Sequence, residues 1–379
     1  MPYFRILSMD GGNGLNTAEL LMFVQEMLPT EAQQDFLNQV DLFVGVSAGA
    51  INSLFFANHD NPTDALSKLR SFWQQIGIDL LEGLRPEHIA ANIQSGKPPD
   101  QLICDILLSA FGLGLTVAGV KPLLYNDAYK KLLIEEFGED TTLGDLNHEV
   151  AILSFQLDGS IDLPLTGGQQ MPFRSWKPKI FTNLKLDGVD EPDLNEKVVD
   201  VALRSSAFPI ELPVYQSISS DGGPGYADGG VVANNPAMCA LAQVLGHKNK
   251  HPERAIPSLP ALCYADLNLD EHILMFSVGT GRNLVGNAQF FAPHFINGSA
   301  PLGYIPWLLD PLSPLLLIDV LLQASSMGID FQVQQLLGDH VHRLNPPLQF
   351  AMVRDDEVTQ GFLQNAVAWL DTSAWLSGA

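Results

Sequence analysis

The first sixty residues alternate between apolar runs and stretches with helical spacing. Residues 4–9 are apolar and end in Asp-Gly-Gly, which predicts a buried strand that enters a tight loop. Residues 17–27 carry apolar side chains at helical spacing, residues 41–46 predict a second buried strand, and the small and apolar residues 48–57 predict a second helix. The order strand, helix, strand, helix is typical of a parallel sheet that helices cover on both faces.

The rest of the chain continues this α/β pattern. We expect helices over residues 62–75, 126–137, 198–206, 315–337 and 358–370, and strands over residues 149–157, 179–184, 273–278 and 341–344. The polar, glycine-rich residues 158–170 are interpreted as a link between two strands. Because neither a repeat nor a long linker separates these elements, the sequence predicts one domain over 1–379, with a core of about 4–350, a cap-like insertion of about 80–121 and a C-terminal helical extension of about 351–379.

The composition combines a high apolar content with a strong acidic charge. Hydrophobic residues make up 46% of the 379 residues, and 43 acidic against 20 basic residues give a net charge of −23. The apolar content excludes a disordered chain. A phosphate backbone requires a basic surface, so we expect no nucleic-acid partner, and adsorption to anionic lipid through charge is disfavoured for the same reason.

Two apolar stretches could be mistaken for membrane spans. Residues 106–120 are uncharged but too few, and residues 302–322 are interrupted by proline and aspartate. A spanning helix requires about 20 apolar residues, so we expect no transmembrane segment and interpret both stretches as core or as a lipid-facing cap. The N-terminus lacks the apolar core and cleavage site of a signal peptide, which favours a cytoplasmic protein that touches membranes only peripherally.

No metal or cofactor site is predicted. Cys104, Cys239 and Cys263 are few and widely spaced, which fits neither a disulfide framework nor a zinc site. The acidic run that starts at Asp266 resembles the beginning of a calcium loop, but Glu271 stands where an EF-hand requires glycine. We therefore interpret it as a polar loop before the strand at 273–278.

The clearest chemical motif is Gly45-Val46-Ser47-Ala48-Gly49, a G-x-S-x-G sequence. It lies between a predicted strand and a predicted helix, where a sharp turn presents the serine hydroxyl at the end of the strand and the helix N-terminus points at it. Gly45 and Gly49 permit the crowded turn, and Ser47 is the candidate nucleophile. A glycine-rich turn without chemistry is the alternative interpretation.

A serine that attacks an ester needs donors for the oxyanion and a base for its proton. The loop that follows the first strand, residues 10–14, offers the backbone N–H groups of Gly11, Gly12 and Asn13 at the same edge of the sheet. The same loop also resembles the phosphate-binding turn of a sugar-kinase-like ATPase, so a phosphotransferase remains an alternative at this point.

None of the nine histidines lies in a pattern that marks a catalytic base. Only one strand precedes the strand before Ser47, which fits poorly with a Ser-Asp-His triad of the α/β-hydrolase type. Asp228, held in a tight turn before Gly229 and Gly230, could receive the serine proton directly. Asn235 followed by Pro236 is interpreted as a helix N-cap rather than a catalytic residue. Since a free aspartate is a weak base at neutral pH, rigid placement would have to compensate.

Together these motifs resemble patatin-like phospholipases. The resemblance rests on three ordered motifs, and further agreement extends it over roughly residues 4 to 350: it runs through residues 142–146, 207–209, 277–281 and 330–332. It implies a three-layer α/β/α sandwich with a mostly parallel central sheet and helical cap insertions. It also implies a Ser-Asp dyad of Ser47 and Asp228, with the oxyanion hole at Gly11, Gly12 and Asn13.

The resemblance further implies a lipid acyl hydrolase, a phospholipase A-type esterase whose partners are phospholipids, lysophospholipids or other fatty-acyl esters, without a cofactor or metal. One departure bears on this activity. The family's glycine loop has a third glycine, a basic residue and a last glycine where this chain has Asn13, Leu15 and Asn16. A weakly active or inactive lipid-binding or storage protein is therefore the second alternative. The excess of apolar residues fits a fatty-acyl channel with a cap formed by residues 80–121 and 302–322.

Overall fold

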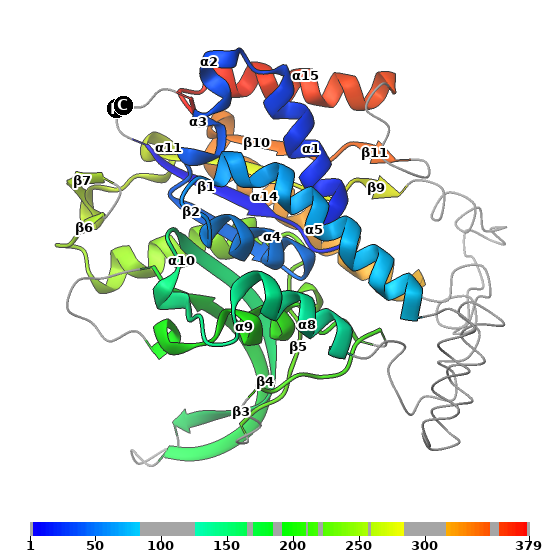
Figure 1. Ribbon diagram of the computed structural model, residues 1–379. Helices are drawn as coiled ribbons and strands as arrows, with labels where there is room; N and C mark the ends of the chain where they lie inside the picture. The colour runs from blue at the N-terminus through cyan, green and yellow to red at the C-terminus, as the bar shows by residue number, and fades with distance from the viewer. Residues whose placement is uncertain are drawn as a thin grey trace, which may run out of the picture.

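A computed structural model describes the protein over residues 3–83, 126–164, 170–184, 192–209, 211–218, 223–256, 259–283, 316–348 and 356–376. Its centre is a seven-stranded sheet in the order β10-β8-β1-β2-β3-β4, with β5 paired to β3 (Figure 1). These strands are β1 (Phe4–Met9), β2 (Leu42–Val46), β3 (Glu149–Pro164), β4 (Gln170–Thr182), β5 (Tyr226–Asp228), β8 (Ile273–Val278) and β10 (Val341–Leu344).

Five strands are parallel, and β4 and β5 run antiparallel to β3. The register aligns Met9 at the end of β1 with Gly45 on one side and Val278 on the other. The loops that follow β1, β2 and β8 therefore meet at one edge of the sheet. Carboxyl edges of parallel sheets are where ligands bind in such folds.

Both faces of the sheet are buried, as the unbroken apolar strands predict. Leu7 and Phe43 pack into a core beneath α1, α3, α4, α5, α8, α9 and α15, whereas Ile6 and Val44 pack into a second core beneath α10 and α14. Side chains alternate between the two faces along each strand because successive residues of a strand point in opposite directions. The result is helices on both sides of a mostly parallel sheet, as the sequence predicts.

The helices that cover the sheet are seen around it in Figure 1. They are α1 (Gly14–Met27), α2 (Thr30–Gln33), α3 (Asp35–Asn38), α4 (Ala48–Ala57), α5 (Pro62–Gly83), α8 (Asn126–Phe137), α9 (Val198–Ser205), α10 (Ala237–Lys250), α11 (Leu269–His272), α14 (Leu316–Leu337) and α15 (Glu357–Thr372). Short ribbons are formed by β6 (Ala255–Ile256) with β7 (Leu259–Cys263), and by β9 (Arg282–Asn283) with β11 (Pro347–Leu348).

Most predicted elements are present, and the largest difference is at residues 158–170. The sequence predicts a link there, but β3 continues to Pro164 and β4 begins at Gln170, so the two strands form a long hairpin. The hairpin projects beyond the helices at the lower end of Figure 1. The register of the hairpin shifts between Gln156 and Gly159, which is an irregularity of the bulge type. The sequence does not predict that these strands continue, because the glycines and polar residues interrupt the regular alternation of apolar and polar positions.

The C-terminal helix α15 packs against the core. Leu363, Ala366 and Leu370 of α15, and Trp375 beyond it, are buried in the core that covers α1. Residues 84–121 of the predicted cap, the stretch 106–120, and residues 302–315 lie outside the described residues, while residues 316–322 form the first turns of α14. In the described part of the chain no helix is long and apolar enough to cross a membrane.

Candidate active site

Ser47 occupies a sharp turn between β2 and α4. Its φ of 56° and ψ of −124° lie in a region that residues with a side chain rarely adopt. The turn is possible because a Cβ on Gly45 would meet the backbone of Gly49, and a Cβ on Gly49 would meet the backbone of Met9. Both glycines of the motif are thus required by close approach of the chain, and the strained residue between them is the serine.

A second serine, Ser205, hydrogen bonds to the backbone of this turn. The backbone N–H of Ser47 donates to Oγ of Ser205 at 3.0 Å, and the Ser205 hydroxyl donates to the carbonyl of Leu153 on β3 at 2.6 Å. Ser205 is the last residue of α9 and is fully buried. The hydrogen bonds connect the strained turn to the neighbouring strand, which holds the hydroxyl of Ser47 in one position.

The glycine loop after β1 lies directly beside Ser47. A Cβ on Gly11 would come within 3.1 Å of the Ser47 Cβ, and Gly12 has a φ of 127° with its α-carbon against Thr280. The N–H of Gly11 donates to the carbonyl of Asn234 at 3.0 Å. This hydrogen bond removes Gly11 from the donors that the sequence suggests for an oxyanion, because each backbone N–H has one proton to donate.

The residues that depart from the family's loop are explained by local structure. Asn13 is the N-cap of α1, and its side chain accepts from the N–H of Asn16 at 3.2 Å. The Asn16 side chain donates to the carbonyl of Thr280 at 2.9 Å, which joins α1 to the loop after β8. Leu15 contributes to the wall of the cavity described below. The N–H groups of Gly12 and Asn13 donate to no acceptor among the described residues.

Asp228 ends β5 and is 1% exposed. Its Oδ1 accepts from the N–H of Gly230 at 2.6 Å, whereas Oδ2 is buried and has no partner of normal hydrogen-bond geometry in the described part of the chain. Burial raises the pKa of Asp228 to about 7, the nearby Ser47 side chain and the N–H of Gly230 oppose the shift, and the charge of Glu211 adds to it. The carboxyl therefore has a pKa close to neutral pH, unlike the free aspartate assumed from sequence.

Tyr129 of α8 is a neighbour of this carboxyl that the sequence analysis did not single out. Burial raises the pKa of its phenol, a hydrogen bond with Ser206 opposes the shift, and the charge of Asp228 adds to it. The phenol stays protonated at neutral pH. Ser206 lies just before Ala207, whose carbonyl accepts from the N–H of Asp228 at 2.9 Å, so the carboxyl and the phenol share one wall of the site.

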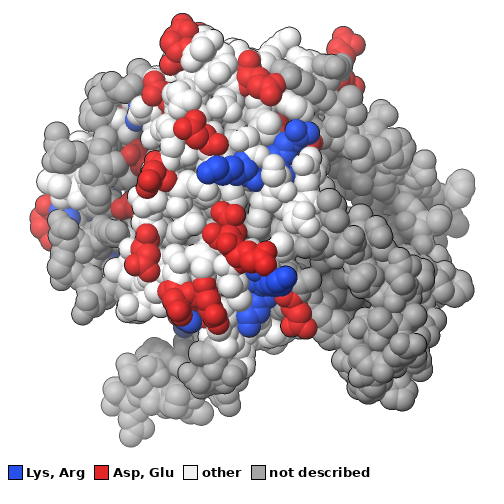
Figure 2. All heavy atoms as spheres, in the orientation of Figure 1, with Lys and Arg blue, Asp and Glu red and all other residues white. Residues whose placement is uncertain are grey.

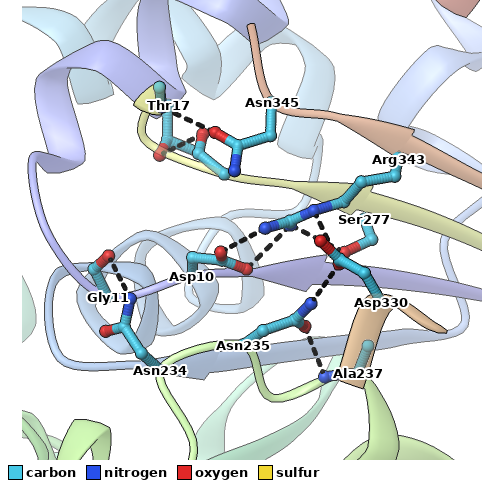
Figure 3. A network of polar contacts seen from close by, with 12 residues as sticks. Asp10, Gly11, Thr17, Asn234, Asn235, Ala237, Ser277, Asp330, Arg343 and Asn345 are labelled. Atoms are coloured by element: carbon cyan, nitrogen blue, oxygen red, sulfur yellow. Dashed lines mark hydrogen bonds and ion pairs between the residues drawn. The ribbon is translucent and has the colours of Figure 1, made fainter. Parts of the chain in front are cut away.

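An ion pair holds the glycine loop from the other side (Figure 3). Arg343 of β10 donates to both carboxylate oxygens of Asp10, and its Nη1 also donates to the Ser277 hydroxyl at 2.9 Å. Its Nε lies 3.0 Å from Oδ1 of Asp330 on α14. Asp10 is 3% exposed, and a buried carboxylate of this kind requires a charged partner.

The same network fixes Asn235. Its Nδ2 donates to Asp330 at 2.7 Å, and its Oδ1 accepts from the N–H of Ala237 at 3.0 Å at the start of α10. The predicted capping contact is therefore present, although Pro236 occupies the N-cap position and α10 begins one residue later. Figure 3 shows Asn235 and Arg343 both directed at Asp330, and both contacts are made to its Oδ1. No motif predicted Arg343, because its partner Asp10 is 333 residues away in the chain.

These elements surround one cavity of about 740 Å³. Ser47, Asp228 and the glycine loop form its polar end, and the remaining wall is largely apolar, with Ile76, Phe208, Leu212, Leu322 and Met327. None of the histidines in the described residues lines this cavity. No group of histidine, cysteine and acidic residues in the described part of the chain could hold a metal ion.

Comparison with known proteins identifies the family of the chain. The family model for patatin-like phospholipase matches residues 7–241. CotR of Bacillus subtilis strain 168, a candidate sporulation hydrolase by its name, is 25% identical over 97% of this chain and 94% of its own length. A cGAMP-activated phospholipase of Pseudomonas aeruginosa is 27% identical over 64% of this chain and 57% of its own. The crystal structure of VipD from Legionella pneumophila aligns at 13% identity with a TM-score of 0.35, over 99% of this chain and 67% of VipD. By its matched motifs and its fold, the chain belongs to the patatin-like phospholipase family.

Proposed function

We propose that the protein is a lipid acyl hydrolase of the phospholipase A type, with Ser47 as the nucleophile and Asp228 as the general base. The observation that carries the proposal is that the strained serine, the buried carboxyl and the glycine loop all line the polar end of one apolar cavity. A serine in this conformation at a strand-to-helix turn is typical of a nucleophile elbow.

In the first step Asp228 accepts the hydroxyl proton as Oγ of Ser47 attacks the ester carbonyl carbon. The N–H groups of Gly12 and Asn13 donate to the oxyanion that forms, since both are without an acceptor in the described structure. The tetrahedral intermediate then collapses, the C–O bond to the alcohol breaks, and the departing alcohol or lysolipid takes the proton back from Asp228. An acyl ester on Ser47 remains.

In the second step Asp228 accepts a proton from water, and the resulting hydroxide attacks the acyl ester. Collapse of the second tetrahedral intermediate releases the fatty acid, and Oγ of Ser47 regains its proton from Asp228. A pKa of about 7 for Asp228 suits both steps, because a general base works best when its pKa lies near the working pH. Tyr129 supports the site as a neutral phenol beside the carboxyl.

The cavity supports a fatty-acyl substrate. A volume of about 740 Å³ lies within the range of pockets that enclose small organic ligands. Ile76, Phe208, Leu212, Leu322 and Met327 give the cavity an apolar wall that suits a hydrocarbon chain, with Glu211 and Gln323 among its polar neighbours. The phosphotransferase alternative gains no support, because Arg343 occupies both carboxylate oxygens of Asp10, the acid that would face a nucleotide.

The proposal is tested by labelling and by substitution. A fluorophosphonate should label Ser47 covalently, and Ser47→Ala should lose hydrolysis of a nitrophenyl ester while its unfolding transition stays cooperative. Exposed Ser71 on α5 provides a matched control, and Ser71→Ala should keep full activity and labelling. An adduct that maps to another serine, or a folded Ser47→Ala variant with wild-type turnover, would refute the assignment. Saturable binding of lipid vesicles without release of alcohol from any ester would instead favour the lipid-binding alternative, whereas a burst of one alcohol per enzyme would show the acyl-enzyme.

A further inference from the structure

Helix α14 exposes large apolar side chains next to the cavity. Leu321 is 60% exposed, Met327 56% and Phe331 66%, and Leu336 further along is 41% exposed. Single exposed apolar residues are ordinary on protein surfaces, but several on one helix mark an interaction site. We call this group, together with exposed Ala324, the α14 surface.

The spacing along α14 explains how the surface is formed. Leu321, Ala324 and Phe331 recur at intervals of three and seven residues, which aligns them along one side of a helix. Val333 and Leu337 point the other way and are buried against α10 in the second core. At about 1.5 Å per residue the surface extends for roughly 20 Å along the helix axis.

The α14 surface is uncharged in a strongly acidic protein. The 22 residues of α14 contain two charged residues, Asp319 before the α14 surface begins and Asp330 within the stretch that it spans. Asp330 contacts Arg343 and Asn235. The other exposed positions of this stretch are glutamine and glycine: Gln323, Gly328, Gln332, Gln334 and Gln335. Elsewhere acidic side chains are spread over the face of the molecule drawn in Figure 2, as expected for a net charge of −23.

The surface is continuous with the cavity. Met327 belongs to both, because it is exposed and also lines the cavity wall. Leu322 and Ser326 line the cavity as well. In sequence, Leu322 is the neighbour of exposed Leu321 and Ser326 is the neighbour of Met327. A chain that leaves a hydrocarbon phase at the α14 surface would therefore enter the cavity beside Leu322 and Met327, and Asp330, which also lines the cavity, is paired there with Arg343.

We propose that the α14 surface rests on the surface of an uncharged or zwitterionic lipid aggregate and delivers the acyl chain into the cavity. The proposal rests on the proposed function, because the occupant is the lipid phase that contains the substrate. An apolar, charge-free helix side inserts among acyl chains by the hydrophobic effect, and the negative charge of the protein disfavours anionic bilayers. The expected binding partner of the α14 surface is therefore a lipid surface without net charge.

The experiment compares two double variants of the full chain. Leu321→Gln with Phe331→Gln removes the centre of the α14 surface without touching the cavity wall, and Trp176→Gln with Val358→Gln removes apolar side chains that are 69% and 49% exposed elsewhere. Binding to phosphatidylcholine vesicles is measured by sedimentation, and hydrolysis is measured both on those vesicles and on a water-soluble short-chain ester.

We expect the α14 variant to lose about tenfold or more in vesicle binding and in vesicle hydrolysis, since two large apolar side chains would no longer be buried among acyl chains. Its hydrolysis of the soluble ester should be unchanged, and the control variant should behave as wild type in all three assays. In a further single variant, Phe331→Trp, the new tryptophan should fluoresce, and vesicles of brominated phosphatidylcholine should quench that fluorescence.

Several results would overturn the proposal. Equal losses in both double variants would show a general effect of surface polarity, and binding that rises with anionic lipid and collapses in salt would show a charge-driven contact. A wild-type dimer that becomes a monomer in the α14 variant would identify a second copy of the chain as the occupant. Vesicle binding requires no chemistry, so an enzyme that binds vesicles through α14 but hydrolyses no ester would contradict only the proposed function.

Discussion

Replacing Asp228 by asparagine should abolish hydrolysis and, at the same time, stabilise the folded protein at neutral and alkaline pH. Asparagine keeps the shape of the side chain, and its oxygen can still accept from the N–H of Gly230. It cannot accept the proton of Ser47. The stabilisation is expected because the buried carboxylate of Asp228 costs free energy that a neutral amide does not.

The magnitude follows from the pKa. In the unfolded chain Asp228 has a pKa near 3.8, and burial raises it to about 7 in the folded protein. A folded pKa above the unfolded value means that the unfolded state releases its proton first, so stability falls as pH rises from about 4 to about 7 and is constant above that. About three pKa units at 1.36 kcal/mol each correspond to a loss of about 4 kcal/mol between these limits. The asparagine variant lacks this loss.

Urea unfolding of both proteins at pH 5 and at pH 8 measures the difference. Relative to wild type, Asp228→Asn should gain roughly 2–3 kcal/mol more at pH 8 than at pH 5, because only part of the pKa window lies between these values. Exposed Asp127 on α8 provides the control, and Asp127→Asn should show no comparable change. A pH-independent difference between Asp228→Asn and wild type would refute the elevated pKa. The wild-type pH–rate profile should likewise rise through an apparent pKa near 7.

Three further substitutions test the parts of the site separately. Ser47→Gly should relieve the strained φ of 56° and raise the free energy of unfolding by about 1 kcal/mol while activity disappears; a loss of stability would contradict the strain. Gly12→Ala should lower the free energy of unfolding in urea by about 2 kcal/mol, because the φ of Gly12 is 127° and a Cβ would lie 2.7 Å from the Thr280 hydroxyl. If this variant hydrolysed esters as fast as wild type, the loop would be excluded from oxyanion binding. Arg343→Met should cost about 3–5 kcal/mol by removing the charged partner of the buried Asp10 carboxylate, and a variant of wild-type stability would show that this ion pair does not stabilise the fold.

The sequence predicts the nucleophile turn and the base because their chemistry is local. Gly45 and Gly49 flank Ser47 within five residues, so the motif can be read from the sequence, although only the fold shows that Gly49 is required by the backbone of Met9. Asp228 beside Gly229 and Gly230 is recognisable in the same way. The central strands are predictable for a similar reason, since strands buried on both faces are continuous apolar runs.

What the sequence does not predict depends on contacts between distant residues. The loss of Gly11 as a donor follows from its hydrogen bond to Asn234, 223 residues further along the chain. The elevated pKa of Asp228 follows from burial beneath several elements, which no motif encodes. The apolar positions of α14 indicate a helix, but whether they face the core or solvent depends on where α10 packs. Each of these features is a property of the assembled fold.

The pairing of Arg343 with Asp10 has a consequence for how the chain can vary or be divided. The region that matches the family ends at residue 241, yet β1 has β8 as a neighbour and its loop is anchored from β10. A fragment that ends at 241 would carry the serine, the aspartate and the glycine loop, but would leave an open strand edge and would lack the guanidinium that pairs with the buried Asp10 carboxylate. Two fragments divided near residue 257 should therefore hydrolyse no ester when separate and should regain hydrolysis only when they are mixed and associate. Related proteins in which Asp10 is replaced should also have Arg343 replaced.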